Sequence, residues 1–166
     1  MDEVENYRMR LKDNDIDRLH ETIFDIGKSN CYDLEKEIAS FLHHEEADIR
    51  SAAIRVLAFY WQLDNYKDAA EQMFLDKSEP DHVRDVAVMS WGIYYYKKNS
   101  SFAIEKLYKI VCDKNEPDDV RASAYNAILS STILPVSDVR RSQGDTESIN
   151  DLVDWPLLDQ IREVAR

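Results

Sequence analysis

The sequence predicts an all-helical fold, a right-handed α-solenoid in which short helix pairs stack side by side. Only 3 glycines and 4 prolines occur in 166 residues, and sheet-rich folds need more turn residues than that. Apolar residues recur at helical spacing along most of the chain, and one segment occurs three times in phase. We expect a single domain over residues 1–166, with a helical cap at each end.

The repeated segment begins with acidic residues and ends with an arginine. Its copies are Glu45-Glu46-Ala47-Asp48-Ile49-Arg50, Glu79-Pro80-Asp81-His82-Val83-Arg84 and Glu116-Pro117-Asp118-Asp119-Val120-Arg121. Each arginine is followed after three positions by alanine and after seven by a large apolar residue: Ala53 and Leu57, Ala87 and Trp91, Ala124 and Ile128. The β-branched residue, the alanine and the large apolar residue are spaced i, i+4, i+8, which places them on one helical stripe.

Each segment therefore starts the second helix of a pair, because acidic side chains and proline favour the first turn of a helix. An amphipathic first helix is predicted upstream of each one, over 32–43, 65–76 and 100–113. One pair cannot bury its own apolar face, so pairs must stack. The predicted repeats span about 31–64, 65–98 and 99–134.

The two ends are less regular than the repeats. Residues 14–27 predict an N-terminal cap helix that stops at Gly27. Residues 135–166 predict a loop, over 137–150, followed by a cap helix from Trp155 to Ala165 with Asp154 as its N-cap. That last helix would cover the open end of the stack.

The motif Asp-x-Val-Arg-x-x-Ala at the start of a second helix resembles the HEAT repeat family over residues 31–134. The period is shorter than the ~40–47 residues usual for HEAT repeats, so the chain resembles the compact HEAT-like repeats of small bacterial proteins. The signatures of tetratricopeptide and ankyrin repeats are absent. The resemblance implies that Arg50, Arg84 and Arg121 form an internal ladder by pairing with acids of the same or the next repeat.

The charge balance restricts the kind of partner. The chain has 33 acidic and 21 basic side chains, a net charge of -12, which disfavours nucleic-acid binding and favours a basic protein. No segment predicts a signal peptide or a membrane span. Cys31 and Cys112 stand alone, so we expect reduced, buried thiols in a cytoplasmic protein.

The sequence offers no catalytic motif, and we expect neither enzyme activity nor a cofactor. G-x-S-x-G, the P-loop and G-x-G-x-x-G are all missing. Two His-Glu pairs, His20-Glu21 and His44-Glu45, are similar to the iron-binding dyads of HEAT-like deoxyhypusine hydroxylases. They do not occupy equivalent positions in the repeats, so we interpret them as surface residues and expect no metal site.

The candidate binding residues fall into two groups. Loops before the second helices hold more acids than capping requires, which suggests an acidic ridge of Glu45, Glu46, Asp48, Glu79, Asp81, Glu116, Asp118 and Asp119. The ends of the second helices hold aromatic residues at equivalent positions, namely Tyr60, Trp61, Tyr94 and Tyr95. These aromatic side chains either anchor a partner or fill gaps between repeats.

Small, acidic, HEAT-like single-domain proteins resemble immunity proteins of bacterial toxin systems, including contact-dependent inhibition. This resemblance implies a one-to-one complex with a basic toxin domain, in many cases a nuclease, whose cleft an acidic surface could occupy. The alternative is a general scaffold or adaptor for another cellular partner.

Overall fold

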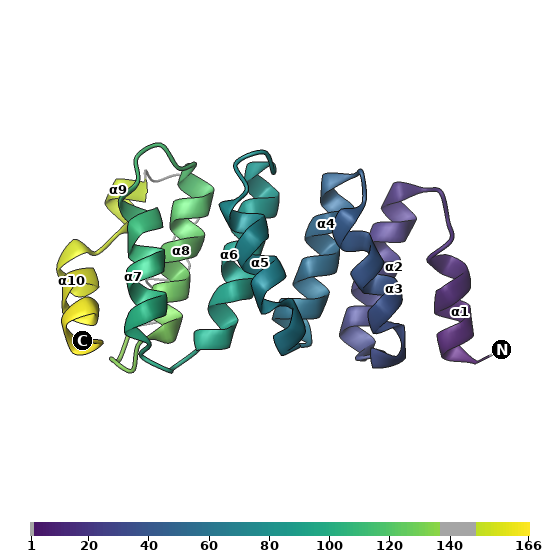
Figure 1. The fold of residues 1–166 in the computed structure, drawn as a ribbon, viewed down its shortest axis with the longest axis horizontal. Coiled ribbons are helices and arrows are strands. Elements are labelled where there is room, and N and C mark those ends of the chain that lie inside the picture. Colours follow the sequence, from purple (N-terminus) through teal and green to yellow (C-terminus); the bar gives the residue numbers. More distant parts are fainter. Residues whose placement is uncertain (1, 137–148) are drawn as a thin grey trace.

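The computed structural model describes residues 2–136 and 149–166, and all regular structure in these residues is helical. Figure 1 shows the helices standing side by side in a row, with the two termini at opposite ends. The α-helices are α1 (Glu3–Arg10), α2 (Ile16–Ser29), α3 (Glu35–Ser40), α4 (Ala47–Ile54), α5 (Lys67–Leu75), α6 (Asp81–Gly92), α7 (Ser101–Cys112), α8 (Asp118–Ser131), α9 (Ile149–Leu152) and α10 (Trp155–Val164). The prediction of an all-helical fold is confirmed for these residues.

Short turns of other helix types extend several of these helices. The 3₁₀ turns are η1 (Tyr32–Leu34), η2 (Phe41–His43), η4 (Asp64–Tyr66) and η5 (Ile93–Tyr95), and η3 (Arg55–Tyr60) is a π-helical turn that continues α4. With these turns included, the predicted first helices over 32–43, 65–76 and 100–113 agree with the structure to within one residue at each end. The second helices α4, α6 and α8 begin in the three repeated segments, as predicted.

The second helices form the continuous part of the row. In the series α2, α4, α6 and α8, each helix packs against the next one. The first helices α5 and α7 pack against α6 and α8 respectively. The predicted stripe is the core of these contacts, because all nine of its side chains are fully buried: Ile49, Ala53, Leu57, Val83, Ala87, Trp91, Val120, Ala124 and Ile128. Helical periodicity alone therefore identified the contact face.

The apolar core consists of two clusters that meet in α4. Ile49 and Leu57 belong to the cluster built from α1 to α4, whereas Ile54 and Ala58 belong to the cluster that continues to α10. Leu42 and Tyr66 pack against both clusters. The molecule therefore has a boundary between two cores at the junction of the first and second predicted repeats.

The N-terminal end differs from the prediction in two ways. The helix α2 does not stop at Gly27 but continues to Ser29, and Asn30 ends it in the left-handed conformation (φ 54°). Gly27 is needed for close packing, since a Cβ atom there would lie 2.7 Å from Val56 Cγ2. An additional helix, α1, precedes α2, and an ion pair of 2.7 Å between Arg10 and Asp25 joins the two.

The C-terminal cap helix is confirmed. Asp154 accepts a hydrogen bond of 3.0 Å from the backbone N–H of Leu157, as expected for an N-cap. Ile149 and Val153 are buried in the larger cluster, and α9 occupies the end of the segment for which we predicted a loop. The rest of that predicted loop, residues 137–148, lies outside the described residues.

The expectation of two buried thiols is wrong. Cys31 is half-buried and Cys112 is exposed, and both are free thiols. Cys112 is the last residue of α7 and lies outside the i, i+3, i+7 stripe formed by Ile104, Leu107 and Val111. A cysteine at the end of a helix is placed by its position in the turn, not by its apolar character.

Replacing Gly92 by alanine should destabilise the protein. A Cβ atom at Gly92 would lie 2.7 Å from the Cβ of Ala127, where α6 crosses α8. Better helix propensity contributes ~1 kcal/mol, but overpacking costs ~1–3 kcal/mol, so we expect a lower free energy of unfolding in urea titrations. The double variant Gly92→Ala/Ala127→Gly restores the space and should recover the loss; no recovery would contradict this explanation.

Candidate functional site

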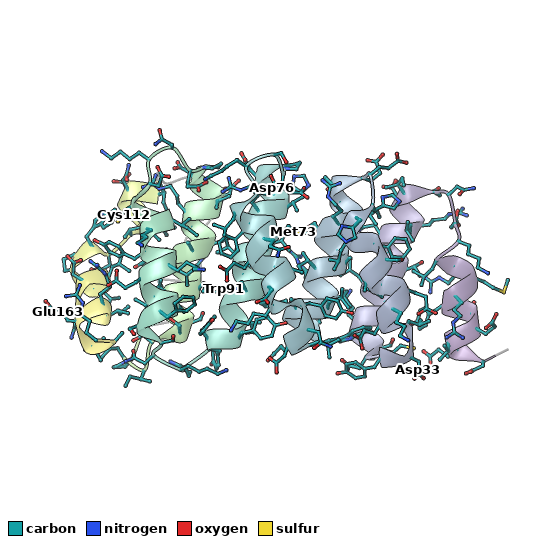
Figure 2. The ribbon with its side chains drawn as sticks, in the orientation of Figure 1. Asp33, Met73, Asp76, Trp91, Cys112 and Glu163 are labelled. Atoms are coloured by element: carbon teal, nitrogen blue, oxygen red, sulfur yellow. The ribbon has the colours of Figure 1, made fainter. Side chains whose placement is uncertain are left out.

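The loops that precede α4, α6 and α8 lie along one edge of the row, which we call the loop edge. It comprises residues 44–48, 76–81 and 113–119. Figure 2 places Asp76 on this edge and Asp33 on the opposite one. The candidate acids of the sequence are therefore brought together along one side of the molecule.

Buried arginines form the inner layer of the loop edge. Arg84 Nε donates to the carbonyl oxygen of Phe74 (3.0 Å), and its Nη2 donates to Glu116 (2.7 Å) in the next loop. Arg121 repeats the first contact, since its Nε donates to the carbonyl oxygen of Val111 (2.9 Å). Each arginine satisfies a carbonyl at the end of the preceding helix. Arg84 also fixes the next loop in position, whereas Arg121 Nη2 donates to Asn150 of α9 (3.2 Å).

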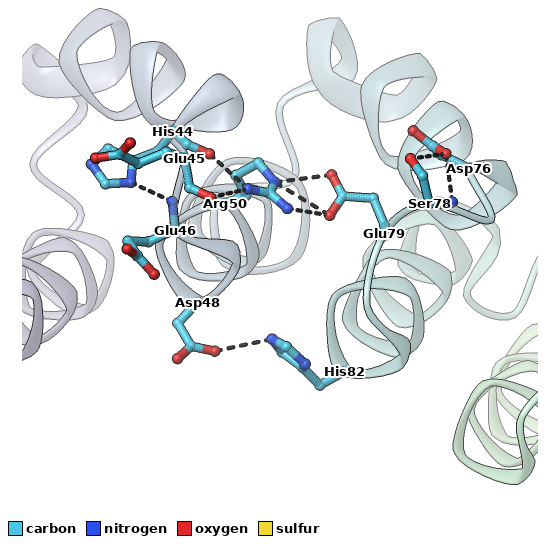
Figure 3. A network of polar contacts seen from close by, with 9 residues as sticks. All are labelled: His44, Glu45, Glu46, Asp48, Arg50, Asp76, Ser78, Glu79 and His82. Carbon is cyan, nitrogen blue, oxygen red and sulfur yellow. Dashed lines mark hydrogen bonds and ion pairs between the residues drawn. The ribbon is translucent and has the colours of Figure 1, made fainter.

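Arg50 makes the equivalent link at the boundary between the two cores (Figure 3). Its Nε and Nη2 donate to Glu79 at 2.9 and 2.6 Å, and its Nη1 donates to the carbonyl oxygens of His44 and Glu45. Figure 3 also shows a second link, in which Asp48 lies 3.0 Å from His82 Nε2. The expected arginine ladder is confirmed, with partners in the next repeat for Arg50 and Arg84.

The ladder corrects the predicted acidic ridge at two positions. Glu116 is 8% exposed, and it pairs with both Arg84 and Lys77. The Glu79 side chain is 14% exposed and pairs with Arg50. Both carboxylates are engaged inside the protein, because the arginine three or four residues into each second helix reaches across to the following loop. Neither is available as a free acid of a ridge.

The other six predicted acids are exposed. They do not act as helix caps, because α4, α6 and α8 have no side-chain hydrogen bond at their N-caps. Asp118 keeps 64% of its side chain exposed beside Arg121, and Asp48 keeps 70% exposed beside His82. We call this set the exposed edge acids: Glu45, Glu46, Asp48, Asp81, Asp118 and Asp119.

Two aspartates that the sequence interpretation passed over also shape the loop edge. Asp76 accepts hydrogen bonds from Ser78 N and Oγ (2.8 and 2.7 Å), and Asp113 accepts the equivalent bonds from Asn115 (2.9 and 3.0 Å). These donors lower the pKa of both carboxyl groups, so both stay ionised. An Asp two residues before Ser or Asn was a usable signal for such a turn.

A further carboxyl group with an unusual environment is that of Asp85, in the second helix α6. Asp85 in α6 is half-buried, and its Oδ1 is buried without a hydrogen-bond partner in the part of the chain that the structure describes. Burial raises the pKa of this carboxyl, and the nearby charge of Asp119 raises it further.

The candidate aromatic anchors are mostly buried, which corrects their assignment as a set. Trp61 is 6% exposed and its Nε1 donates to the Gly27 carbonyl oxygen (3.1 Å), while Tyr94 is 7% exposed and donates to the Leu63 carbonyl oxygen (2.6 Å). Tyr95 is half-buried against Trp91, with ring centroids 4.6 Å apart. Tyr60 is exposed, at 37%. The alternative that these rings fill gaps between repeats holds for Trp61 and Tyr94.

Sequence reasoning missed Phe102 in α7, which is 58% exposed although its ring lies 6.3 Å from that of Trp91, centroid to centroid. Among the described residues, no group of three or more His, Cys, Asp or Glu side chains could hold a metal ion. None of the helices in the same residues is long and apolar enough to cross a membrane.

No family model matches the chain, and neither the curated proteins nor the solved structures give a significant match.

Proposed function

We propose that the chain is a single HEAT-like domain, a right-handed α-solenoid of three helix pairs with a helical cap at each end. The repeated segments, the stacked second helices and the arginine ladder support this architecture. Arg84 and Arg121 join the two helices of their own pairs, and Arg50 and Arg84 link their pairs to the following loop, as expected for repeats that are stabilised by their neighbours.

We further propose that the domain is a non-enzymatic protein-binding module whose partner is basic. The single observation that carries this proposal is the separation of roles among the loop acids. Glu79, Glu116 and Asp118 pair with the ladder arginines, whereas the other five exposed edge acids are in excess of what the ladder and the helix caps use. A row of like charges on one edge gives a long-range attraction for a cationic surface.

The partner that agrees best with the resemblance to immunity proteins is a toxin domain, of the basic nuclease type. A nuclease cleft is cationic because it binds a phosphate backbone. The carboxylates of the loop edge lie in successive loops, one loop for each helix pair, and can form ion pairs with the same cationic side chains. We propose a one-to-one complex in the cytoplasm, where such an inhibitor would meet an imported toxin. The alternative function is a scaffold or adaptor for another basic cellular protein.

The decisive experiment uses the product of the gene adjacent to this one in its genome. The two purified proteins are mixed and examined by size-exclusion chromatography with light scattering, and the nuclease activity of the neighbour is measured on plasmid DNA. A one-to-one complex without nuclease activity is the expected result. A neighbour that is not basic, does not bind, or keeps its activity when bound would overturn the immunity function and leave the scaffold alternative.

The exposed edge acids should control the rate of association with such a partner. In the double variant Asp81→Lys/Asp119→Lys, we expect association at low salt to slow by at least ~10-fold, with a smaller change in dissociation, because steering depends on the long-range field. Stopped-flow fluorescence at several salt concentrations measures both rates.

A matched control separates the edge from the total charge. Asp33→Lys/Asp68→Lys changes the net charge equally and also replaces aspartates in the first turns of helices, but at the opposite edge. We expect this variant to associate within ~3-fold of the unaltered protein, since its changes lie further from the contact. Equal slowing by both variants would exclude the loop edge as the contact surface.

A further inference from the structure

A groove lies at the loop edge between the first-helix elements of two neighbouring repeats. It has a volume of about 310 Å³, and its lining includes Leu42 from η2 and Ala69 and Met73 from α5. These three side chains are half-buried and pack against the larger apolar cluster. Figure 2 shows Met73 on the side of α5 that faces α3 and α4, close to Asp76. The groove therefore has an apolar floor that remains accessible.

The groove exists because a side chain is missing at this junction. Helix length does not account for it, since η1, α3 and η2 together span 32–43 and η4 with α5 spans 64–75. At the next junction, between α5 and α7, Lys106 reaches back to Glu71, and its ammonium lies 4.9 Å from the Phe102 ring centroid. Ala69 is the equivalent of Lys106, since each stands fifteen residues before its ladder arginine.

The chain thus shows at one junction what fills such a space: a long cationic side chain that lies on apolar surface and ends at a carboxylate. Lysine and arginine combine an aliphatic stem with a charged end, which suits this environment. At the junction of α3 and α5 the corresponding side chain is absent, because alanine ends at its Cβ atom.

The lining of the groove attracts a cation. Asp76 and Glu79 are its two carboxylates, it holds no lysine or arginine, and His43 is the remaining lining residue with an ionisable side chain. Glu79 is engaged by Arg50. In Asp76, the hydrogen bonds from Ser78 go to Oδ1, while Oδ2 accepts none from the part of the chain that the structure describes. The side-chain amide of Gln72, also in the lining, offers a second oxygen acceptor beside it.

We propose that this groove binds an arginine side chain of the basic partner. The methylene groups lie on Leu42, Ala69 and Met73, and the guanidinium donates to Asp76 Oδ2 and to the amide oxygen of Gln72. Arginine is preferred over lysine because its planar guanidinium is weakly hydrated and donates to two acceptors at once. This inference rests on the proposed function, in that the partner is basic.

The test uses a short probe in place of the partner. The peptide acetyl-Gly-Arg-Gly-amide is titrated into the full chain with ¹³C-labelled methionine and leucine methyl groups, and acetyl-Gly-Glu-Gly-amide serves as the control peptide. We expect saturable shifts of the Met73 and Leu42 methyl signals with the arginine peptide, weaker binding of the lysine analogue, and none of the glutamate analogue. The absence of shifts at both methyl groups would overturn the proposal.

Two variants and one matched control test the carboxylate of Asp76 and the open space beside Ala69. Asp76→Asn should lower the affinity for the arginine peptide by ~3-fold or more, because the exposed ion pair is lost. Ala69→Trp fills the groove and should lower this affinity by at least ~10-fold. The control Asp113→Asn removes the same charge from the equivalent turn in the next repeat and should leave binding unchanged. If circular dichroism shows that Ala69→Trp does not fold, Asp76→Asn is the deciding variant. Equal affinities of Asp76→Asn and Asp113→Asn for the arginine peptide would contradict the proposal.

The proposal and the proposed function can fail separately. If a basic toxin domain binds the chain and Asp76→Asn leaves its affinity unchanged, the groove is not the arginine site and the function stands. If the peptide binds in the groove but no basic neighbour forms a complex, the site stands and the partner assignment falls.

Discussion

Replacing Glu116 by alanine should cost ~3–5 kcal/mol of the free energy of unfolding, because it leaves a buried arginine without its counter-charge. The side chains of Arg84 and Glu116 are only 5% and 7% exposed, and their ion pair of 2.7 Å joins two neighbouring repeats. The variant also removes the partner of Lys77. Urea unfolding followed by circular dichroism measures the loss.

Two further variants test this explanation. Glu79→Ala removes the equivalent link to Arg50, where the side chains are 17% and 14% exposed, so water can partly replace the carboxylate and the cost should be smaller. The double variant Arg84→Met/Glu116→Leu replaces both charges by apolar groups and should recover more than half of the loss. A single-variant cost below ~1 kcal/mol would show that Arg84 finds water on its own.

The second large effect is expected for Trp91→Ala, at ~3–5 kcal/mol. Trp91 is fully buried, and the rings of Phe74 and Tyr95 lie 5.7 and 4.6 Å from it, centroid to centroid. The ring of Phe102 lies 6.3 Å from it, so Trp91 joins α6 to the first helices α5 and α7, and the cavity would open inside the larger cluster. Because the variant lacks the fluorescence of Trp91, its stability is measured by urea unfolding followed by circular dichroism.

Trp91→Phe is the matched control for this prediction. The Trp91 Nε1 is buried and makes no hydrogen bond within the described residues, so phenylalanine removes an unsatisfied donor while keeping most of the ring volume. We expect the variant to lose less than ~1.5 kcal/mol. If Trp91→Phe were as destabilising as Trp91→Ala, the effect would have to come from the indole N–H and not from the cavity.

Neighbouring acids in one loop illustrate the limit of sequence reasoning about the site. Glu79 and Asp81 are two residues apart and look alike in the sequence, yet Glu79 is held by Arg50 and Asp81 is exposed. Glu116 and Asp118 differ in exposure only, since Glu116 is buried against Arg84 and Asp118 stays 64% exposed while it pairs with Arg121. The repeated arginine signalled that some acid would pair with it, but the distance across the repeat junction selected which one.

The sequence by itself determined the helix pairs of the three repeats, the C-terminal cap helix and the buried stripe from Ile49 to Ile128, because helical periodicity and the start signals at Asp154 and before each ladder arginine act over a few residues. Only the tertiary structure decided which side chains a neighbouring helix covers. It buried Trp61 and left the adjacent Tyr60 exposed, and it left a groove beside Ala69, where the next repeat carries Lys106. Exposure at a junction depends on the length and side chains of the next repeat, which lie more than thirty residues away in the chain.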